Sequence, residues 1–425
     1  MKLVEITEKE YEKFLNKFDN TLFFQSVEWA KFKSKTEWDM TILGLKDKNN
    51  IKAACILLSR KVPFINKKMY YSPRGFILDY NDFDLIKEFT NELKIYLKNN
   101  KGLFIKINPY IKYQERDKDG NIISDNKDDL VNLLKSLGYI HYGFYVKSVE
   151  KKDLEPRWIS VLDIDKPMDE LLKNMKQTTR WMINKSEKNC IEIEEIGYDK
   201  LEEFKKIMNH TAERRSFDDR ALSYYQIMYK ELSKSNMIKI LLGKIDLRKF
   251  KNNIKDDIKH LNDRIDSIKN NPKKQNQVNE FESQINALNK RLKDVENDIN
   301  NYGNNPYIAA GLYLSYGSEV VYLFGGSYKE FMSYGAQYLM QYEMIKYAKD
   351  NNFKRFNFYG IDGDFSKESI NYGLFDFKRG FNSNVVELIG EFDLVENKFN
   401  YKLYNFLLKQ YKRLRRIKNK IKKGI

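Results

Sequence analysis

One lysine near the end of the sequence has neighbours that would suit a catalytic cation. Lys378 lies in the stretch FDFKRGF, between aromatic residues and just before a glycine, and the apolar, strand-like run VVELIG follows. A cation held among aromatic side chains could stabilise the negative charge that develops on an oxygen atom during acyl transfer. Most lysines of a basic protein are solvated surface charges, so the surroundings of Lys378 decide between these two interpretations.

The histidines and cysteines offer no competing catalytic centre. His141, His210 and His260 are scattered, without the spacing of metal ligands and without an obvious serine or cysteine partner. Cys55 lies in the apolar run AACILL, where a buried thiol is expected, and Cys190 is isolated; such usage suits a reducing cytoplasm. We therefore expect no metal and no cofactor, and chemistry that depends on lysine, arginine, tyrosine, carboxylates or the substrates.

The composition indicates a large folded protein with an anionic partner. The chain has 425 residues, 42% of them hydrophobic, which suggests two or three domains. A net charge of +16 and a pI of about 9.3 favour nucleic acid, an acidic membrane surface or phosphorylated substrates, without choosing among them. The start, MKLVEITEKEYEKF, is charged, and no apolar run reaches the roughly 18 residues of a membrane span, so we expect a soluble or peripheral protein.

Two similar halves are predicted to position these residues. Residues 1–150 alternate helical stretches, such as EKEYEKFLNKF, with strand-like ones, such as IKAACILLS. The pattern repeats over residues 151–381, where YIAAGLYLSYGSEVVYLFGGS predicts a strand hairpin. The simplest interpretation is an α/β (α+β) protein in which each half mixes helices with a largely antiparallel sheet.

Residues 246–302 have a different character from the rest of the second half. Apolar residues recur there at three- and four-residue steps in two seams, separated by NNPKK. This spacing predicts an antiparallel coiled-coil hairpin with arms of about 25 residues, roughly 35–40 Å long. The hairpin could be a spacer or dimer contact, or an arm that touches an extended partner such as RNA.

The last segment, residues 400–425, combines an apolar stripe with many basic residues. The stripe consists of Leu407, Tyr411, Leu414, Ile417 and Ile421. A helix of this kind can lie on an anionic membrane or on RNA phosphates. It can equally dock its apolar side on the protein and be kept soluble by its lysines, and both interpretations stay open.

An ordered series of motifs runs along nearly the whole chain. The series includes FFQSVEWAKFK, YYSPRGFILDY, GLFIKINPYI, PRWISVLDI, TAERRSFDDRALSYY, VVYLFGGSYKEF, QYLMQYEMIKYA, NFYGIDGDF and FKRGFNSNVVELIGEFDL. In this order the motifs resemble the Fem family (FemABX), transferases that build peptidoglycan interpeptide bridges from aminoacyl-tRNA. Each piece is weak alone, but the order is that of the family and the likeness spans nearly the whole chain.

The resemblance implies two acetyltransferase-like (GNAT) domains. The first would comprise residues 1–150 and be completed by about 382–425; the second would comprise residues 151–381. The coiled-coil hairpin at 246–302 would be inserted in the second domain, as in the FemA-like branch. We expect this organisation from the family, not from the composition of the chain.

The resemblance also implies the substrates. An amino acid would pass from aminoacyl-tRNA to an amine of lipid II, its growing bridge or a UDP-linked muropeptide. Glycine is favoured, while serine and alanine stay open. The protein would be cytoplasmic, peripheral at the inner face of an anionic membrane, and could pair with itself or with related transferases.

Two adjacent residues match the family's catalytic pair. Lys378 matches the lysine that stabilises the tetrahedral oxyanion, and Phe377 would contribute its backbone and a wall of the peptide channel. Proton transfer would then be assisted by the substrates. These roles follow from the motif context, since an isolated lysine would be assigned to the surface.

Further matches are with residues that bind substrate. The family has one phosphate-contacting lysine in WAKFK, which is either Lys31 or Lys33 here. Thr179 and Arg180 match a basic helix start that contacts a pyrophosphate, and arginine's planar fork suits that anion. Tyr322 matches a tyrosine that binds the precursor.

The Arg-Gly loop and the strand after it carry the remaining candidates. Tyr71 and Arg74 could bind substrate or simply form a turn. Asn108 departs from the family, which commonly has an aspartate before this proline, so a carboxylate base is not expected there. In a different motif, TAERRSFDDRALSYY, the residues Glu213, Arg214 and Arg220 could form an internal salt-bridge network instead of serving the reaction.

Two other function classes compete with the transferase. An acetyl-CoA-dependent N-acetyltransferase would share the fold, but its pyrophosphate loop would need a basic or amide residue where Met332 stands, ahead of Gly335. A non-enzymatic RNA- or membrane-binding module would explain the hairpin and the basic tail, but it would leave the remaining motifs unexplained.

Overall fold

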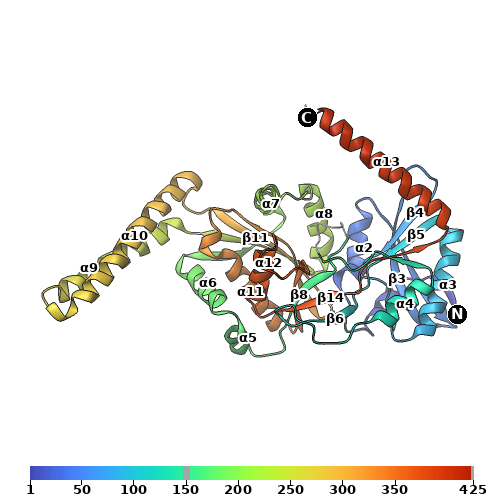
Figure 1. The fold of residues 1–425 in the computed structure, drawn as a ribbon, viewed down its shortest axis with the longest axis horizontal. Helices are drawn as coiled ribbons and strands as arrows, with labels where there is room; N and C mark the ends of the chain where they lie inside the picture. Colours follow the sequence, from blue (N-terminus) through green and yellow to red (C-terminus); the bar gives the residue numbers. More distant parts are fainter. Residues whose placement is uncertain (147–153, 423–425) are drawn as a thin grey trace.

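The computed structural model describes residues 1–146 and 154–422 and builds them around two β-sheets (Figure 1). The first sheet has seven strands within these residues, in the order β1 (Lys2–Glu5), β2 (Asp39–Asp47), β3 (Asn50–Lys61), β4 (Lys68–Ser72), β5 (Gly102–Ile107), β15 (Phe392–Val395) and β7 (Tyr139–His141). All neighbours pair antiparallel except β4 and β5.

The second sheet has eight strands within the described residues and is also largely antiparallel. Its order is β6 (Lys112–Glu115), β14 (Asn384–Leu388), β8 (Trp158–Asp163), β13 (Arg355–Ile361), β12 (Glu319–Ser327), β11 (Tyr307–Tyr316), β10 (Ile238–Ile245) and β9 (Ile191–Glu195). Only β12 and β13 pair in parallel. The mixed α/β class predicted from the sequence is confirmed.

Amphipathic helices cover the first sheet. They are α1 (Glu8–Leu15), α2 (Val27–Ser34), α3 (Phe83–Asn99) and α4 (Asp128–Ser136). Thr7 begins α1 in a capping box with Glu10, which satisfies backbone donors that a helix start leaves free. The apolar faces of α3 and α4 form one buried cluster with strand residues such as Leu57 and Ile105.

Helices lie on both faces of the second sheet. They are α5 (Met168–Asn174), α6 (Gln177–Lys188), α7 (Leu201–Arg215), α8 (Leu222–Leu232), α11 (Ala336–Asp350) and α12 (Tyr372–Arg379). Residues of α6 and α11 share one apolar cluster, and residues of α7 and α8 share another. The second cluster also contains Phe23 and Trp29 of the first half, so the two halves share a core where α2 meets α8.

Strands cross between the halves in both directions. β6 lies early in the sequence, yet it pairs with β14 at the edge of the second sheet. β15, near the end of the chain, returns to the first sheet between β5 and β7. The domain boundary expected at residue 150 lies outside the described residues, and the proposed division into two GNAT-like domains stays a prediction.

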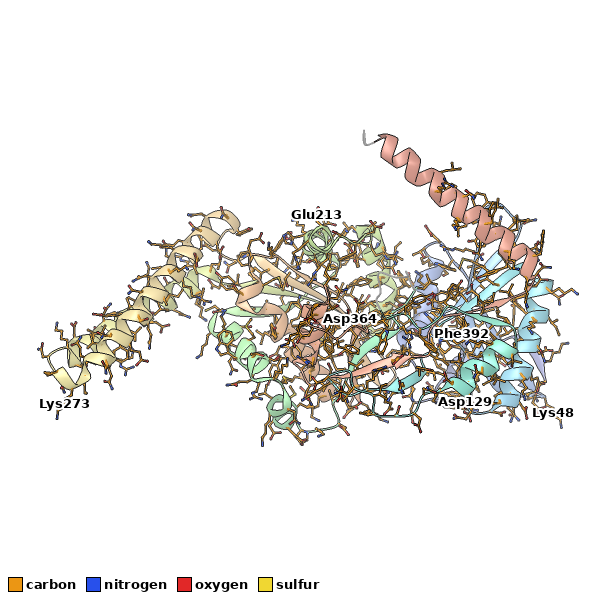
Figure 2. The ribbon with its side chains drawn as sticks, in the orientation of Figure 1. Lys48, Asp129, Glu213, Lys273, Asp364 and Phe392 are labelled. Atoms are coloured by element: carbon orange, nitrogen blue, oxygen red, sulfur yellow. The ribbon has the colours of Figure 1, made fainter. Side chains whose placement is uncertain are left out.

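Two long helices form the projection seen on the left in Figure 1. They are α9 (Leu247–Ile268) and α10 (Gln275–Tyr302), and Lys273 marks the tip between them (Figure 2). Ile254, Val278 and Val295 are buried along their contact. A helical hairpin is thus present at the predicted place, while the supercoiled geometry of a coiled coil stays a prediction.

The last helix, α13 (Lys398–Lys422), begins against the first sheet and then leaves the body of the protein (Figure 1). Phe392, labelled in Figure 2, lies in the strand that precedes it. Over the residues that the structure describes, no helix is both long and apolar enough to cross a membrane.

Candidate active site

Lys378 is buried rather than solvated. It lies in the last turn of α12, its side chain points inward, and only 4% of the residue is exposed. Its ammonium donates a hydrogen bond to the carbonyl oxygen of Gly360, 2.6 Å away. Among the described residues, no carboxylate forms an ion pair with it, and burial lowers the pKa of Lys378 to about 7. The site therefore holds an amine that is readily interconverted between its charged and neutral forms.

Aromatic rings surround the turn that carries Lys378. The ring of Phe377 lies 4.9 Å from that of Tyr338 and 5.5 Å from that of Phe381. Phe381 in turn packs on Phe358 of β13. These contacts fix the orientation of α12, so a small movement of Lys378 would require repacking of several rings.

The start of α6 packs against the turn after Lys378. Thr179 is buried, and a Cβ atom on Gly380 would come within 2.3 Å of its hydroxyl, so only glycine fits there. The N–H of Lys176 donates to the carbonyl of Gly380. The structure thus brings Thr179 next to the turn that bears the proposed catalytic pair.

Arg180 is engaged by backbone groups of its own segment. Its guanidinium donates to the carbonyl oxygens of Lys173 and Met175, at 2.6 Å each. Both oxygens belong to the junction of α5 and α6. These bonds give Arg180 a local structural role, and its proposed contact with a pyrophosphate stays a prediction.

Tyr322 belongs to the same apolar cluster as Phe377 and Tyr338. Its hydroxyl donates to the side-chain oxygen of Gln337 at 3.1 Å, and its ring stacks on Tyr313. Burial raises its pKa above the ordinary value, so the group stays a neutral hydroxyl.

A second group of candidates gathers where the first half meets the second. Arg74 is buried and has a left-handed backbone (φ 58°), which is uncommon for a residue with a side chain. Its N–H donates to the Asn108 side-chain oxygen at 2.8 Å, and its guanidinium donates to the Pro156 carbonyl. The Asn108 amide donates to the Tyr71 hydroxyl at 3.1 Å. Asn108 therefore holds the Arg-Gly loop through one donor and one acceptor.

Glu155 and Tyr359 complete this group, and the sequence analysis missed both. The Tyr359 hydroxyl donates to the Glu155 carboxylate, and the Arg74 guanidinium lies 6.0 Å from the centre of the Tyr359 ring. Burial raises the pKa of Glu155, while Arg74 and the bond from Tyr359 act in the opposite direction. Tyr359 lies in the motif NFYGIDGDF, but nothing in the sequence distinguished either Tyr359 or Glu155 from their neighbours.

The backbone at Tyr359 joins the two groups. Tyr359 also has a left-handed backbone (φ 65°), at a bulge where the register of β13 against β8 shifts. Its side chain faces Arg74, while the next residue, Gly360, accepts the hydrogen bond from Lys378. Residues held in such uncommon backbone conformations cluster at active sites and at segments that hold ligands.

The geometry distinguishes the two lysines of α2. Lys31 is exposed and forms an ion pair with Glu8 at 2.6 Å. Lys33 lies partly buried with its ammonium over the rings of Phe32 and Tyr224, and burial together with the nearby Arg220 lowers its pKa to about 8.

Arg220 provides a second cation from the other half of the protein. Its guanidinium lies 5.2 Å from the centre of the Tyr224 ring, and the Lys33 ammonium lies 5.5 Å from it, so two positive groups lie beside this ring. Within residues 1–146 and 154–422, neither Lys33 nor Arg220 forms an ion pair. Two neighbouring cations that form no ion pair among the described residues are suited to an anionic ligand, although Glu155 also acts on Lys33.

The salt-bridge network considered for Glu213, Arg214 and Arg220 is not formed. In the described part of the chain, none of the three makes an ion pair with another. Arg214 instead donates to the carbonyl oxygen of Ser327. The alternative structural explanation for Arg220 is therefore wrong.

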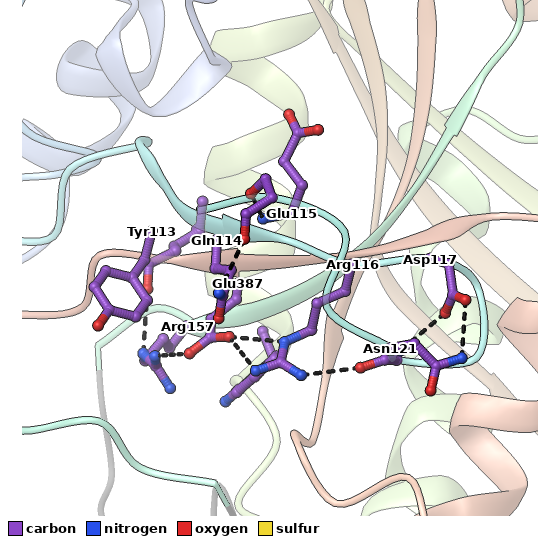
Figure 3. Close-up of polar contacts among 12 residues, drawn as sticks. Tyr113, Gln114, Glu115, Arg116, Asp117, Asn121, Arg157 and Glu387 are labelled. Atoms are coloured by element: carbon purple, nitrogen blue, oxygen red, sulfur yellow. Dashed lines mark hydrogen bonds and ion pairs between the residues drawn. The ribbon is translucent and has the colours of Figure 1, made fainter. Parts of the chain in front are cut away.

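Residues 116–127, between β6 and α4, form a loop that reaches α12 from the first half; we call it the crossover loop. Glu387 accepts from Arg116 at 2.8 Å and from Arg157, and Asp117 binds Asn121 across the tight turn that follows (Figure 3).

The tip of this loop contacts the residue after Lys378. Asp119 forms an ion pair with Arg379 at 2.7 Å, and Arg379 also pairs with Asp376. Asp376 is bound in addition by Lys176 of the α6 start, at 2.6 Å. Ion pairs from the crossover loop and from the start of α6 thus hold the end of α12.

The described residues contain no cluster of three or more histidine, cysteine, aspartate or glutamate side chains suited to hold a metal ion. Cys55 is buried, and burial raises the pKa of its thiol, as expected for an inert cysteine.

Comparison with known proteins gives matches along nearly the entire chain. The FemAB family model matches residues 6–409. An aminoacyltransferase FemB of Staphylococcus epidermidis (strain ATCC 12228) is 33% identical over 446 residues, covering 100% of both chains. An aminoacyltransferase FemA of Staphylococcus aureus (strain MRSA252) is 31% identical over 418 residues, covering 96% of this chain and 99% of the relative.

A solved structure agrees with these matches. The crystal structure of FemX superimposes with a TM-score of 0.73 and 28% identity, covering 95% of this chain and 99% of its own. Because the relatives are aminoacyltransferases, the comparison favours an enzyme over a non-enzymatic binding module. The chain belongs to the FemAB family and is an acyltransferase.

Proposed function

We propose that this protein transfers an amino acid from aminoacyl-tRNA to an amine of a peptidoglycan precursor. The observation that carries the proposal is the buried Lys378, which has no carboxylate partner among the described residues and is held beside Phe377. The family membership supplies the reaction class, and the net charge of +16 suits both a polyanionic donor and a phosphorylated acceptor.

The proposed reaction is aminolysis of an ester. The acceptor nitrogen attacks the carbonyl carbon of the aminoacyl ester and forms a tetrahedral oxyanion. Collapse of this intermediate breaks the ester carbon–oxygen bond and forms the amide. The tRNA ribose oxygen leaves with a proton, and the acceptor nitrogen loses one. The ester is already activated, so no nucleotide hydrolysis is needed.

The charged form of Lys378 is proposed to stabilise the oxyanion. A cation in a water-poor site interacts far more strongly with developing charge than one in bulk water. The pKa of Lys378 is about 7. Negative charge that develops on the substrate would raise this pKa and favour the protonated amine. Phe377 would form a wall of the acceptor channel.

The acceptor's phosphates are proposed to bind Lys33 and Arg220. These two cations come from different halves of the protein and flank Tyr224. Lys31, which pairs with Glu8, is the poorer candidate. Thr179, Arg180 and Tyr322 are retained as proposed precursor contacts.

The group around Arg74 is proposed to line the path between the phosphates and Lys378. Tyr71 and Asn108 hold the Arg74 loop, and Tyr359 connects it to Gly360. Because Asn108 cannot accept the amine proton, we propose a route assisted by the tRNA ribose hydroxyl or phosphate.

Glycine is the proposed amino acid, with serine and alanine as alternatives, and lipid II at the inner face of the membrane is the proposed acceptor. A direct test offers the protein lipid II or the soluble precursor together with tRNA charged with glycine, alanine or serine. Mass spectrometry should find acceptor heavier by one amino acid residue with a single preferred donor. Absence of transfer from every charged tRNA, together with thermal stabilisation by acetyl-CoA, would instead support an acetyltransferase.

A further inference from the structure

Over its described side chains, the helix α13 docks on the protein through the face that carries Tyr401, Tyr404 and Leu408. Tyr401 and Tyr404 are buried, and their rings pack 5.4 and 6.3 Å from that of Phe104 in β5. The Tyr401 hydroxyl also donates to Asp393 at 2.7 Å. Leu408 continues this contact one turn later. The first turns of α13 are therefore firmly held, with a defined orientation relative to the first sheet.

A different face of α13 exposes a row of large apolar side chains. The exposed fractions are 75% for Phe399, 38% for Leu403, 58% for Phe406 and 65% for Leu414. We call these four residues the outer stripe. Their successive steps of four, three and eight residues place them on one side of a helix. In the sequence the same spacing continues to Ile417 and Ile421.

The outer stripe differs from the apolar stripe expected from the sequence. The expected stripe began with Leu407 and Tyr411 and shares Leu414 with the outer stripe. Neither Leu407 nor Tyr411 is among the buried docking residues, which are Tyr401 and Tyr404. Of the expected stripe, Tyr411 and Leu414 are exposed, so the alternative in which α13 docks by that stripe is wrong for these two residues.

A neighbouring loop extends the exposed apolar surface. Phe64, between β3 and β4, is 52% exposed, and its ring lies 5.6 Å from that of Tyr411. Tyr411 is itself exposed. Two separate elements thus present aromatic side chains to solvent at the same place.

Basic residues accompany the outer stripe along the whole helix. From residue 398 to 425 the sequence contains many lysines and arginines and no aspartate or glutamate. Helical spacing places Lys402, Lys409 and Arg413 together along one side of the outer stripe.

We propose that the outer stripe of α13, together with Phe64, is a docking surface for an anionic lipid bilayer. At a bilayer interface, apolar side chains insert between acyl chains while lysines and arginines contact anionic headgroups. RNA phosphates would engage the basic residues but leave the phenylalanines in water. A second copy of this helix would bring like charges together along the same stripe. The bilayer is the occupant that accounts for both the exposed apolar side chains and the basic residues beside them.

The test measures binding of the full-length protein to vesicles in a sedimentation assay. The vesicles contain phosphatidylcholine with or without phosphatidylglycerol and carry no acceptor substrate. The result is therefore independent of the proposed function. The variant F399S/F406S/L414S removes three exposed side chains, and I95S/I370S, at exposed sites elsewhere, is its matched control.

The wild-type protein should bind the anionic vesicles. The stripe variant should bind them about 100-fold more weakly, since each lost apolar side chain removes roughly a factor of five. The control should bind like the wild type. The charge variant K402Q/K409Q/R413Q should lose affinity for the anionic vesicles, and salt should have the same effect.

Three results would overturn the proposal. The stripe variant could bind vesicles as tightly as the wild type. The wild type could ignore vesicles while the stripe variant loses affinity for tRNA, which would make RNA the occupant. Or the wild type could form a dimer in sedimentation velocity that the stripe variant abolishes, without vesicle binding, which would make a second copy the occupant.

Discussion

At the scale of single residues, Lys378 links the burial of an amine to its proposed chemistry. An exposed lysine stays charged across the physiological range, whereas burial lowers the pKa of Lys378 to about 7. The folded protein therefore binds fewer protons at this site than the unfolded chain does between about pH 7 and the ordinary lysine value.

This proton difference predicts how stability depends on pH. Because the unfolded chain binds more protons in that window, the contribution of Lys378 to the free energy of unfolding should rise as pH rises from about 7 to 10. Urea unfolding of the wild type and of Lys378→Met should reveal it, since the variant should lack this rise. A rise of equal size in both proteins would show that Lys378 is not buried as described. Lys367→Met, at an exposed site near α12, is the matched control.

The two cations at Tyr224 give a second prediction. Lys33→Ala and Arg220→Ala should each raise KM for the phosphorylated acceptor about tenfold, with a smaller change in kcat, because each removes one charge-assisted contact. Lys31→Ala, two residues away and paired with Glu8, should leave KM unchanged. Steady-state kinetics decide the assignment: a KM effect at Lys31 without one at Lys33 would reverse it.

Asn108, which follows β5 and binds the Arg-Gly loop, gives a third prediction. Asn108→Asp would place a carboxylate near Arg74 and remove the amide that donates to Tyr71. We expect the single-turnover rate to stay within about tenfold of the wild type, because the proposed route needs no side-chain base there. A rate increase of several orders of magnitude would contradict substrate-assisted proton transfer.

At the scale of elements, α12 is held in place by contacts from both halves of the protein. Asp119, at the tip of the crossover loop, pairs with Arg379 next to Lys378, and Asp376 is paired with Lys176. We infer that Asp119 is a positioning residue for the proposed catalytic lysine. Its effect would then act on the chemical step more than on substrate binding.

Asp119→Asn should therefore lower kcat about tenfold with little change in KM or in melting temperature. Asp119→Glu should restore much of kcat, because it keeps the charge that Arg379 needs. A matched control is Asp125→Asn in the same loop, an exposed residue that forms no ion pair within the described residues. If Asp119→Asn lowered the melting temperature strongly and Asp119→Glu restored nothing, the contact would be only structural.

The same elements show what the sequence could and could not predict. Periodicity located most helices and strands, including the hairpin and α13, because amphipathic faces leave a local pattern. It did not predict that α5 and α6 are separate, since the break at Met175 involves neither glycine nor proline. Nor did it predict β6 in the second sheet or Glu155 beside Arg74, because both depend on contacts between distant segments.

Motif order located the candidate site where periodicity could not. It indicated Lys378 and the Arg-Gly loop, but it left Lys31 and Lys33 undistinguished, because both lie in one helical turn. Only packing against Tyr224 of the other half favours Lys33. Burial of Lys378 also required the assembled fold, since its immediate neighbours in sequence include Arg379 and Asp376.

At the scale of the whole molecule, two helical features extend beyond the two sheets. The hairpin of α9 and α10 and the helix α13 project from opposite halves (Figure 1). With a net charge of +16, such extensions would suit the proposed function, in which the protein meets a large polyanion and a membrane-bound acceptor. The proposed lipid contact of α13 would hold the first half near the acceptor and leave the hairpin side free.

The central claim is that the amine of Lys378 stabilises the oxyanion formed during aminoacyl transfer. Single-turnover transfer from charged tRNA to precursor tests this claim most directly. Lys378→Met keeps the length of the side chain and removes the amine. The account predicts that the rate of amide formation falls by about 10²–10³-fold, while affinity for charged tRNA and melting temperature stay near those of the wild type. A variant that transfers the amino acid at the wild-type rate would contradict it.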